Sequence, residues 1–313
     1  MITQLARSEL ARASAGRPTA VTIGKFDGVH RGHQHLVRRL LEEARKRDLA
    51  SVVVTMHPHP ATVLRPGTPI SYLCSLEGRV ELLQGLGVDQ VAVLSFTSEL
   101  AQLSYREFVT LIIDQLDMRL LLAGSDLALG RNREGDVEAI RPLALEKGFE
   151  LTLVELLSED DEKVGSGAVR EALAAGEMET VTRLLGRPFA LHGPVVRGAE
   201  RGRTIGFPTA NIAIGADLAL PSFGVYVTRA YLGESRYDSI TNIGKRPTFD
   251  EDRPTIETHI LDFDADCYEQ QLRIELLTRV RDEMRFDGVE ALKAQIGSDV
   301  QTARDYFAKE RKP

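Results

Sequence analysis

Tryptophan is absent from the 313-residue chain, and aromatic residues of all kinds make up only 6% of it. The two cysteines, Cys74 and Cys267, lie far apart in the sequence, which favours a reducing compartment over a disulfide framework and excludes a CxxC metal site. No apolar run approaches the roughly 18–20 residues that span a bilayer. The N-terminal segment lacks the basic and then apolar layout of a signal peptide. We therefore expect a cytoplasmic protein without a membrane partner.

An excess of positive charge is also missing, because 39 Lys and Arg residues face 46 Asp and Glu residues, for a net charge of −7. Proteins that bind nucleic acid non-specifically need clustered positive charge, so we expect no nucleic-acid partner. At about 150 residues per domain, the length predicts two domains, each long enough to bury a core. For the oligomeric state, the sequence leaves a monomer and a weak homo-oligomer open.

Short apolar runs typical of β-strands alternate with amphipathic helical patterns through the first half of the chain. This alternation indicates βαβ units, and so an α/β domain with a parallel sheet and helices on both faces. Ligands of such sheets bind at the carboxyl ends of the strands, so the loops after Gly24, Thr55 and Ala123 are candidate sites. The expected strands are 20–24, 51–55, 90–94, 119–123 and 150–154, and the expected helices are 33–46, 76–85, 105–115 and 137–147.

The pattern changes after two short predicted helices at 168–175 and 178–185. A Gly-Arg-Pro sequence at 186–188 ends them, and short β-prone runs punctuated by Gly and Pro follow. This pattern predicts an antiparallel barrel or sandwich, closed by a C-terminal helix over 288–309. We place the domain boundary at Gly186, which divides the chain into domains 1–186 and 187–313. The expected strands of the second domain are 190–196, 211–214, 224–231, 238–242, 255–261 and 271–280.

The densest motif is Gly-Lys-Phe-Asp-Gly-Val-His-Arg-Gly-His-Gln at 24–34, between the first strand and the first helix. Helix N-termini attract phosphate, and the imidazoles of His30 and His33 can donate hydrogen bonds to a leaving pyrophosphate. Gly32, between them, allows a nucleotide to approach closely. A surface loop with two solvated histidines is the alternative. The residues expected to hold ATP in this loop are Gly24, Phe26, Asp27 and Gly32.

A second constellation lies in the other half, where Gly-Phe-Pro-Thr-Ala-Asn at 206–211 forms a rigid turn. The hydroxyl of Thr209 and the amide of Asn211 can ligate Mg²⁺ together with nucleotide phosphates, since Mg²⁺ prefers oxygen ligands. Gly202 precedes them in a charged turn. Phe207 is a candidate wall of a ligand pocket, although core packing would explain it equally. For the turn itself, the alternative is a β-turn capped by asparagine.

Glu257 lies in a strand of apolar and β-branched residues, where alternation puts it on one face with His259. A carboxylate on the pocket face can accept the proton of a hydroxyl that attacks a γ-phosphate, whereas an exposed strand Glu is the alternative. Arg281 and Arg285 could neutralise phosphate, and a solvated face would explain them as well.

Taken together, these motifs resemble those of the bacterial bifunctional riboflavin kinase/FAD synthetase family. HxGH is the signature of nucleotidylyltransferases, and the longer loop at 24–34 is similar to the amino-terminal module of that family. The segments at 52–60, 123–136 and 165–173 resemble its other substrate loops. The segments at 206–211, 242–248 and 255–263 resemble its riboflavin kinase module. The resemblance covers residues 20–307 and implies a Rossmann-like nucleotidylyltransferase domain followed by an antiparallel β-barrel kinase domain.

The resemblance also implies roles for individual residues and a sequence of substrates. Ser166 and Arg170 would hold ATP phosphates, Asp126 would lie near the substrates, and Glu257 would act on the ribityl hydroxyl. Phe207, Arg281 and Arg285 would contact the flavin. ATP, Mg²⁺, riboflavin, FMN and FAD would be the ligands. The chain departs from the family at three places, which would affect flavin stacking and phosphate donors. These are Met56-His57, the pair Leu127 and Leu129, and Gly165-Ser166-Gly167.

Three functions remain open from the sequence. The first is a two-step enzyme that phosphorylates riboflavin to FMN and then adenylylates FMN to FAD and pyrophosphate. The second is a riboflavin kinase whose adenylyltransferase module is weakened or degenerate. The third is a non-enzymatic sensor of flavin or nucleotide built on the same folds.

Overall fold

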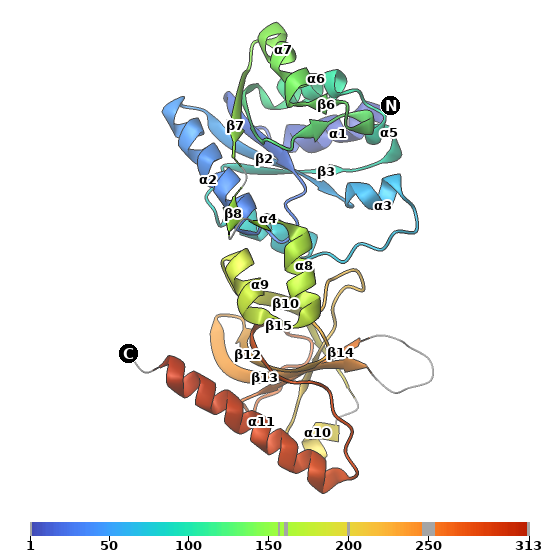
Figure 1. Ribbon diagram of the computed structural model, residues 1–313, viewed down its shortest axis with the longest axis vertical. Helices are drawn as coiled ribbons and strands as arrows, with labels where there is room; N and C mark the ends of the chain where they lie inside the picture. Colours follow the sequence, from blue (N-terminus) through green and yellow to red (C-terminus); the bar gives the residue numbers. More distant parts are fainter. Residues whose placement is uncertain (1, 156, 160–161, 199–200, 246–253, 312–313) are drawn as a thin grey trace. The chain divides into compact units, whose positions relative to one another are not determined.

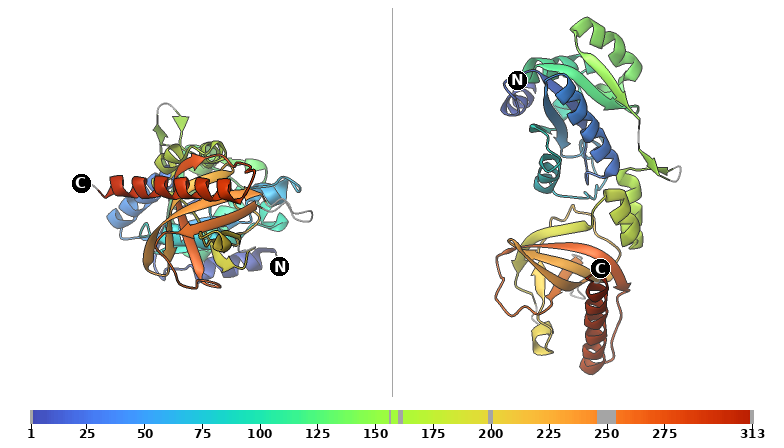
Figure 2. Two further views of the ribbon diagram at one scale, coloured as in Figure 1. Left: turned by 90° about the horizontal axis from the view of Figure 1, so that it is seen from below. Right: turned by 90° about the vertical axis from the view of Figure 1, so that its left-hand side faces the viewer.

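The computed structural model describes residues 2–155, 157–159, 162–198, 201–245 and 254–311 (Figures 1 and 2). The chain divides into two compact units, Met1–Ser166 and Gly167–Pro313. Among the described residues, no helix is both long and apolar enough to cross a membrane.

The first unit is built on a parallel sheet of five strands in the order β3-β2-β1-β4-β7. Because β1 lies between β2 and β4, the strand order reverses beside β1. Crevices for ligands form at such a reversal, outside the carboxyl ends of the strands. The α/β prediction is therefore confirmed, and the loop after β1 lies at the switch point. The strands are β1 Thr19–Gly24, β2 Ala50–His57, β3 Gln90–Ser95, β4 Met118–Gly124 and β7 Glu150–Val154.

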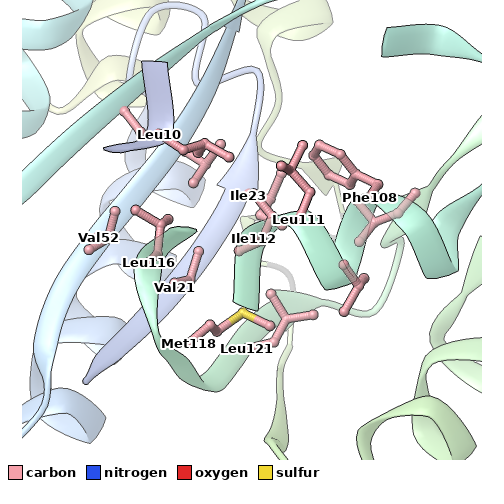
Figure 3. Packing of buried hydrophobic residues seen from close by; sticks show 14 of the residues in the cluster. Leu10, Val21, Ile23, Val52, Phe108, Leu111, Ile112, Leu116, Met118 and Leu121 are labelled. Carbon is pink, nitrogen blue, oxygen red and sulfur yellow. The ribbon is translucent and has the colours of Figure 1, made fainter. Parts of the chain in front are cut away.

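Helices cover both faces of this sheet, and a separate apolar cluster fills each side. On one side, Val21 and Ile23 of β1 pack with residues of α1 and α6 (Figure 3). On the other side, Ala20 packs with Val37 and Leu40 of α2. The side chains of β1 thus alternate between two cores, as expected for a strand buried on both faces. The helices are α1 Ile2–Arg12, α2 Arg31–Lys46, α3 Pro60–Leu64, α4 Leu76–Gln84, α5 Ser98–Ala101, α6 Tyr105–Leu116 and α7 Val137–Lys147.

Helix α1 was not predicted from the sequence. It lies against β3 and α6, where its Ala6 and Leu10 are buried, together with Ala13 just beyond the end of the helix. Small alanines on two of these positions leave only a weak helical pattern, which explains why sequence periodicity missed it. Short elements complete the unit, namely β5 Ala128–Leu129, the 3-10 turn Arg131–Arg133, β6 Gly135–Asp136, β8 Ser158–Glu159 and β9 Glu162–Lys163.

The second unit contains a closed antiparallel barrel in the order β10-β11-β14-β13-β12-β15, so the barrel and not the open sandwich is correct. The buried hydroxyls of Thr228, Ser239, Thr241 and Thr258 hydrogen-bond to one another inside it, at 2.8–2.9 Å. The strands are β10 Phe189–Val196, β11 Ala210–Ile212, β12 Gly224–Leu232, β13 Ser235–Lys245, β14 Pro254–Ile260 and β15 Gln271–Arg281.

Helix α11, Val289–Glu310, lies along the barrel wall, where Ala303 and Phe307 pack on Val225 and Val227 of β12 (Figure 2). The other helices are α8 Ser166–Ala175, α9 Met178–Leu185 and α10 Arg201–Thr204. Helix α9 packs against β15 and β10 of the barrel. It therefore belongs to the second compact unit, which begins at Gly167, before the predicted boundary at Gly186. The functional boundary at Gly186 stays a prediction.

Candidate active site

The loop between β1 and α2 brings both histidines of the HxGH motif to the start of a helix. His30 is the N-cap of α2, and its Nδ1 accepts a hydrogen bond from the backbone N–H of His33 at 3.4 Å. Their rings stack with centroids 3.7 Å apart and 21° between the ring planes. Free N–H groups and the helix dipole attract phosphate at such a position. The two histidines therefore lie where an anionic substrate would be held.

Burial is the main reason that the pKa of His33 lies well below its usual range, and the positive charges of His30, Lys25 and Arg79 lower it further. His33 is therefore neutral at neutral pH. Its Nδ1 is buried and has no hydrogen-bond partner among the described residues. A neutral imidazole can donate one hydrogen bond to a phosphate, and it gains affinity for a proton when negative charge arrives nearby.

Phe26 and Asp27 shape this loop from inside the protein. Phe26 is fully buried, and its ring centroid lies 5.0 Å from that of His33. Asp27 is 2% exposed, and its carboxylate accepts a hydrogen bond from the backbone N–H of Leu73 at 2.9 Å. Both residues thus fix the loop on which the histidines stand. Direct contact of either residue with ATP stays a prediction.

The glycines of the motif stand where neighbouring atoms come close. A Cβ on Gly32 would lie 3.0 Å from the carbonyl oxygen of Val164 and 3.2 Å from the His30 ring. A Cβ on Gly24 would lie 3.0 Å from the Phe26 ring. Because such contacts are tight, a side chain at either position would push on the histidine loop.

Ser166 lies against the same loop at the start of α8. Its Oγ donates a hydrogen bond to the backbone carbonyl of Asp27 at 2.9 Å. Gly165 and Gly167 flank it, and a Cβ at either would meet no atom within 4 Å. Arg170 follows one turn further along α8, in the second unit. Its phosphate-binding role stays a prediction.

The loop after β4 carries the expected flavin-side residues. Asp126 is exposed in this loop, and β4 is the neighbour of β1 in the sheet, so the loops after the two strands leave the same edge. Leu127 packs against the apolar cluster that contains Phe108, and Leu129 is a 6%-exposed member of it. The leucine pair therefore extends a core rather than forming an exposed stacking wall. A role of Asp126 in flavin binding stays a prediction.

Sequence reasoning missed Arg79, which lies at the carboxyl end of β2. Its Nη1 donates a hydrogen bond to the carbonyl oxygen of Met56 at 3.0 Å, although only 1% of the residue is exposed. The sequence did contain a signal for a buried arginine. Arg79 lies three residues after Leu76 and four residues before Leu83, on the apolar side of a predicted helix. His57 lies beside this contact, with its ring 5.6 Å from that of Tyr72.

In the barrel, Glu257 stands on the face that strand alternation predicted. Ile256 and Thr258 are buried, whereas Glu257 and His259 are partly exposed. Backbone register makes Asn211 of β11 and Asn242 of β13 the direct neighbours of Glu257. Directly opposed residues of antiparallel strands share a face, so the carboxylate lies between two amides.

Asn242 is a second residue to which sequence reasoning assigned no role, although the motif containing it was noted. The strand pattern of 238–242 could have shown that it alternates with buried Thr241. The rest of that motif, residues 246–248, lies outside the described residues. Cross-strand register, which only the fold supplies, is what places Asn242 beside Glu257.

Two glycines bring loops onto the predicted metal-binding pair. A Cβ on Gly202 would lie 2.3 Å from the carbonyl oxygen of Phe207 and 3.5 Å from Thr209 Oγ1. A Cβ on Gly198 would lie 2.3 Å from Asn211 Nδ2. Glycine at both positions lets backbone approach the hydroxyl and the amide closely. Binding of a cation and a substrate phosphate by this pair stays a prediction.

Phe207 also lies near the predicted base. Its ring is perpendicular to that of His259, with centroids 5.6 Å apart, and His259 Nδ1 lies 2.7 Å from the carbonyl oxygen of Pro208. His259 shares its strand face with Glu257. The turn at 206–211 is thereby tied to β14, so Phe207 and Glu257 belong to one region of the barrel.

Arg281 is held in an ion pair within the barrel domain. Its Nε lies 3.0 Å from both carboxylate oxygens of Asp299, and its Nη2 lies 2.6 Å from Oδ2. The guanidinium therefore joins β15 to α11. Arg285 is exposed in the segment between these elements. Flavin contacts by the two arginines stay predictions.

Comparisons with known proteins match each unit to a flavin enzyme. The FAD synthetase family model matches residues 13–168, and the riboflavin kinase family model matches residues 185–307. The bifunctional riboflavin kinase/FMN adenylyltransferase of Escherichia coli strain K12 is 38% identical over 92% of this chain and 92% of its own. The protein of that name from Bacillus subtilis strain 168 is 36% identical over 94% of both chains. This chain belongs to that bifunctional family.

The family resemblance read from the motifs is thereby confirmed, with an FAD synthetase domain and a riboflavin kinase domain in the expected order. The presence of both domains favours the bifunctional interpretation over a kinase alone and over a sensor. A crystal structure titled as a macrolide-efflux protein from Streptococcus pneumoniae has the same fold. Its TM-score is 0.85 and its identity is 31%, over 94% of this chain and 96% of that one.

The riboflavin kinase domain offers oxygen ligands rather than a metal cage. Among the described residues, no group of three or more His, Cys, Asp or Glu side chains could hold a metal ion. The hydroxyl of Thr209 and the amide oxygen of Asn211 are hard ligands that suit Mg²⁺ when phosphate oxygens supply the rest of its shell. The donor set therefore fits Mg²⁺ that arrives with ATP as part of the substrate.

Proposed function

We propose that the chain makes FAD from riboflavin in two steps, in two separate sites. The riboflavin kinase domain transfers the γ-phosphate of Mg-ATP to riboflavin and yields FMN. The FAD synthetase domain joins FMN to the adenylyl group of a second ATP and releases pyrophosphate. The observation that carries the proposal is the pairing of two complete domains of the bifunctional family, each with its own polar site.

In the kinase step, Glu257 is the base. Its carboxylate accepts the proton of the terminal ribityl hydroxyl as that oxygen attacks the γ-phosphorus of ATP. The bond between the γ-phosphorus and the bridging oxygen breaks, and ADP leaves. Thr209 and Asn211 hold the Mg²⁺ of Mg-ATP beside this carboxylate, and Gly202 lets the backbone approach the phosphates.

In the adenylyl step, a phosphate oxygen of FMN attacks the α-phosphorus of ATP, and the bond to the β-phosphate breaks. His30, His33 and the N-terminus of α2 stabilise the negative charge that gathers on the leaving pyrophosphate. Positioning and charge neutralisation supply the catalysis, so no covalent enzyme intermediate is required. Ser166 and Arg170 hold the nucleotide phosphates, and Asp126 faces the flavin.

A product assay tests the proposal directly. The purified chain is incubated with Mg-ATP and either riboflavin or FMN, and the flavins are separated by chromatography. We expect riboflavin to pass through FMN to FAD, and FMN alone to give FAD. Riboflavin that stops at FMN would leave only the kinase, and no product from either substrate would favour the sensor. Cytoplasmic location and the absence of a nucleic-acid partner stay part of this proposal.

A further inference from the structure

Among the residues that the structure describes, Arg79 is a buried cation without an acidic partner. It lies on α4, which begins after the N-cap Ser75, and only 1% of the residue is exposed. No carboxylate forms an ion pair with it among the described residues, and its Nε has no hydrogen-bond partner there. A buried charge without a compensating partner is costly.

The guanidinium ties together the ends of two strands. Its Nη1 lies 3.0 Å from the carbonyl oxygen of Met56 and 3.4 Å from Thr55 Oγ1, both at the carboxyl end of β2. Thr55 Oγ1 in turn donates a hydrogen bond to the carbonyl oxygen of Lys25, at 2.9 Å, just beyond β1. Arg79 is thus linked through one hydroxyl to the loop that carries the HxGH histidines.

The loop after β1 also links Arg79 to His33 through packing. Lys25 is followed by Phe26, whose ring packs 5.0 Å from the His33 ring. The charged groups that act on His33 come from three elements, namely Lys25 in the loop, His30 at the start of α2, and Arg79 on α4. Together with burial, they hold the pKa of His33 below its usual range. The carboxylate of Asp27, in the same loop, accepts a hydrogen bond from Leu73.

We propose that Arg79 is a positioning residue for adenylyl transfer, which fastens the ends of β1 and β2 beside the histidine loop and adds positive charge near His33. The role rests on the proposed function of the first domain. The negative charge of ATP then compensates the positive charges of Arg79 and Lys25. Because Arg79 is buried, it acts on the site through its charge and its hydrogen bonds and does not contact the substrate.

The test compares Arg79→Met, which removes the charge and keeps an unbranched side chain, with Arg79→Lys, which keeps the charge. NMR titration of the His33 Cε1–H signal in the full-length apo chain reports His33 directly. We expect Arg79→Met to move the midpoint to higher pH and Arg79→Lys to leave it near the wild-type value. Arg141→Met, on the exposed face of α7, is the matched control and should change nothing.

Activity gives a second readout in the same chain. We expect Arg79→Met to slow FAD formation from FMN by about 10–100-fold at pH 7, with the acidic limb of its pH profile moved to higher pH. Riboflavin phosphorylation should stay within about twofold of wild type, because it occurs in the other domain. Arg79→Lys should restore most of the FAD-forming activity.

An unchanged His33 titration in a folded Arg79→Met variant would overturn the proposal. If Arg79→Met does not fold, Arg79→Lys carries the test, and a His33 midpoint that departs from wild type despite the retained charge would contradict it. The titration needs no turnover. A wild-type chain that forms no FAD from FMN would therefore refute the function of the first domain while this proposal remained measurable.

Discussion

Asn211 on β11 and Glu257 on β14 are direct partners across the barrel wall, with Asn242 on β13 flanking Glu257 from the other side. Glu257 therefore sits in a row of polar side chains that spans three strands. Strand alternation directs its side chain to the face of the sheet that it shares with the two asparagines. That geometry places the proposed base beside the proposed ligand of Mg-ATP.

Replacement of this carboxylate should separate the two activities. Glu257→Gln keeps the shape of the side chain but cannot accept a proton, so we expect riboflavin phosphorylation to fall by about 10²–10⁴-fold. FAD formation from supplied FMN should be unchanged. Chromatography of the flavin products measures both rates. Glu234→Gln, in the exposed turn after β12, is the control, and kinase turnover unaffected by Glu257→Gln would exclude Glu257 as the base.

A methyl group at Gly32 should impair only the first domain. Its Cβ would lie 3.0 Å from the Val164 carbonyl oxygen and 3.2 Å from the His30 ring, so the ring must shift by a few tenths of an ångström. We expect Gly32→Ala to reduce FAD formation from FMN by about tenfold or more, because small misplacements of catalytic groups are costly. Gly78→Ala is the matched control, since its Cβ would find its nearest neighbour at 3.4 Å. Equal effects of the two variants would contradict the prediction.

The ion pair between Arg281 and Asp299 should stabilise the docking of α11 on the barrel. Asp299 is 4% exposed, so Asp299→Asn leaves the partner charge without compensation. Loss of one partner of a buried ion pair costs about 3 kcal/mol in the free energy of unfolding. Urea unfolding, followed by circular dichroism, measures this change.

Asp305 supplies the control on the same helix. It accepts a hydrogen bond from Gln301 at an exposed position, so Asp305→Asn should change the free energy of unfolding by no more than about 0.5 kcal/mol. Similar stabilities of the two variants would show that the Arg281 pair does not hold α11.

Acidification should destabilise the first domain through His33. Its pKa is lowered in the folded state, first by burial and then by neighbouring positive charge, whereas an unfolded histidine titrates near pH ~6.5. The unfolded chain therefore binds more protons below about pH 6.5, and stability falls as the pH decreases through that range. We expect the melting temperature of wild type to drop between pH 7 and pH 5.5 more steeply than that of His33→Asn.

Carboxylates should not obscure that measurement. The pKa of Glu43 on α2 is lowered to about 2 by hydrogen bonds from Lys46 and Arg47. Its contribution to stability is fully present above its usual pKa and is lost only as the pH falls through about 2. Identical slopes for wild type and His33→Asn between pH 7 and pH 5.5 would exclude His33 as the titrating group.

Much of the fold was predictable because apolar spacing is a local property. The alternation around Glu257 predicted its face correctly, and the position of His30 before a helix predicted an N-terminal anion site. Two kinds of feature escaped. Helix α1 buries only Ala6 and Leu10 among its described side chains, which gives little periodicity. Arg79 is a charged residue on a buried face, which pattern rules assign to solvent.

By itself, the sequence determined the two-domain order, the parallel and antiparallel character of the sheets, and the motifs that identify the family. Each of these rests on residues close together in the chain. The tertiary structure decided that the β-rich half closes into a barrel, that Asn242 flanks Glu257, and that Arg79 reaches the histidine loop through Thr55. Strand register and the burial of a charge depend on contacts between distant segments, which local patterns do not encode.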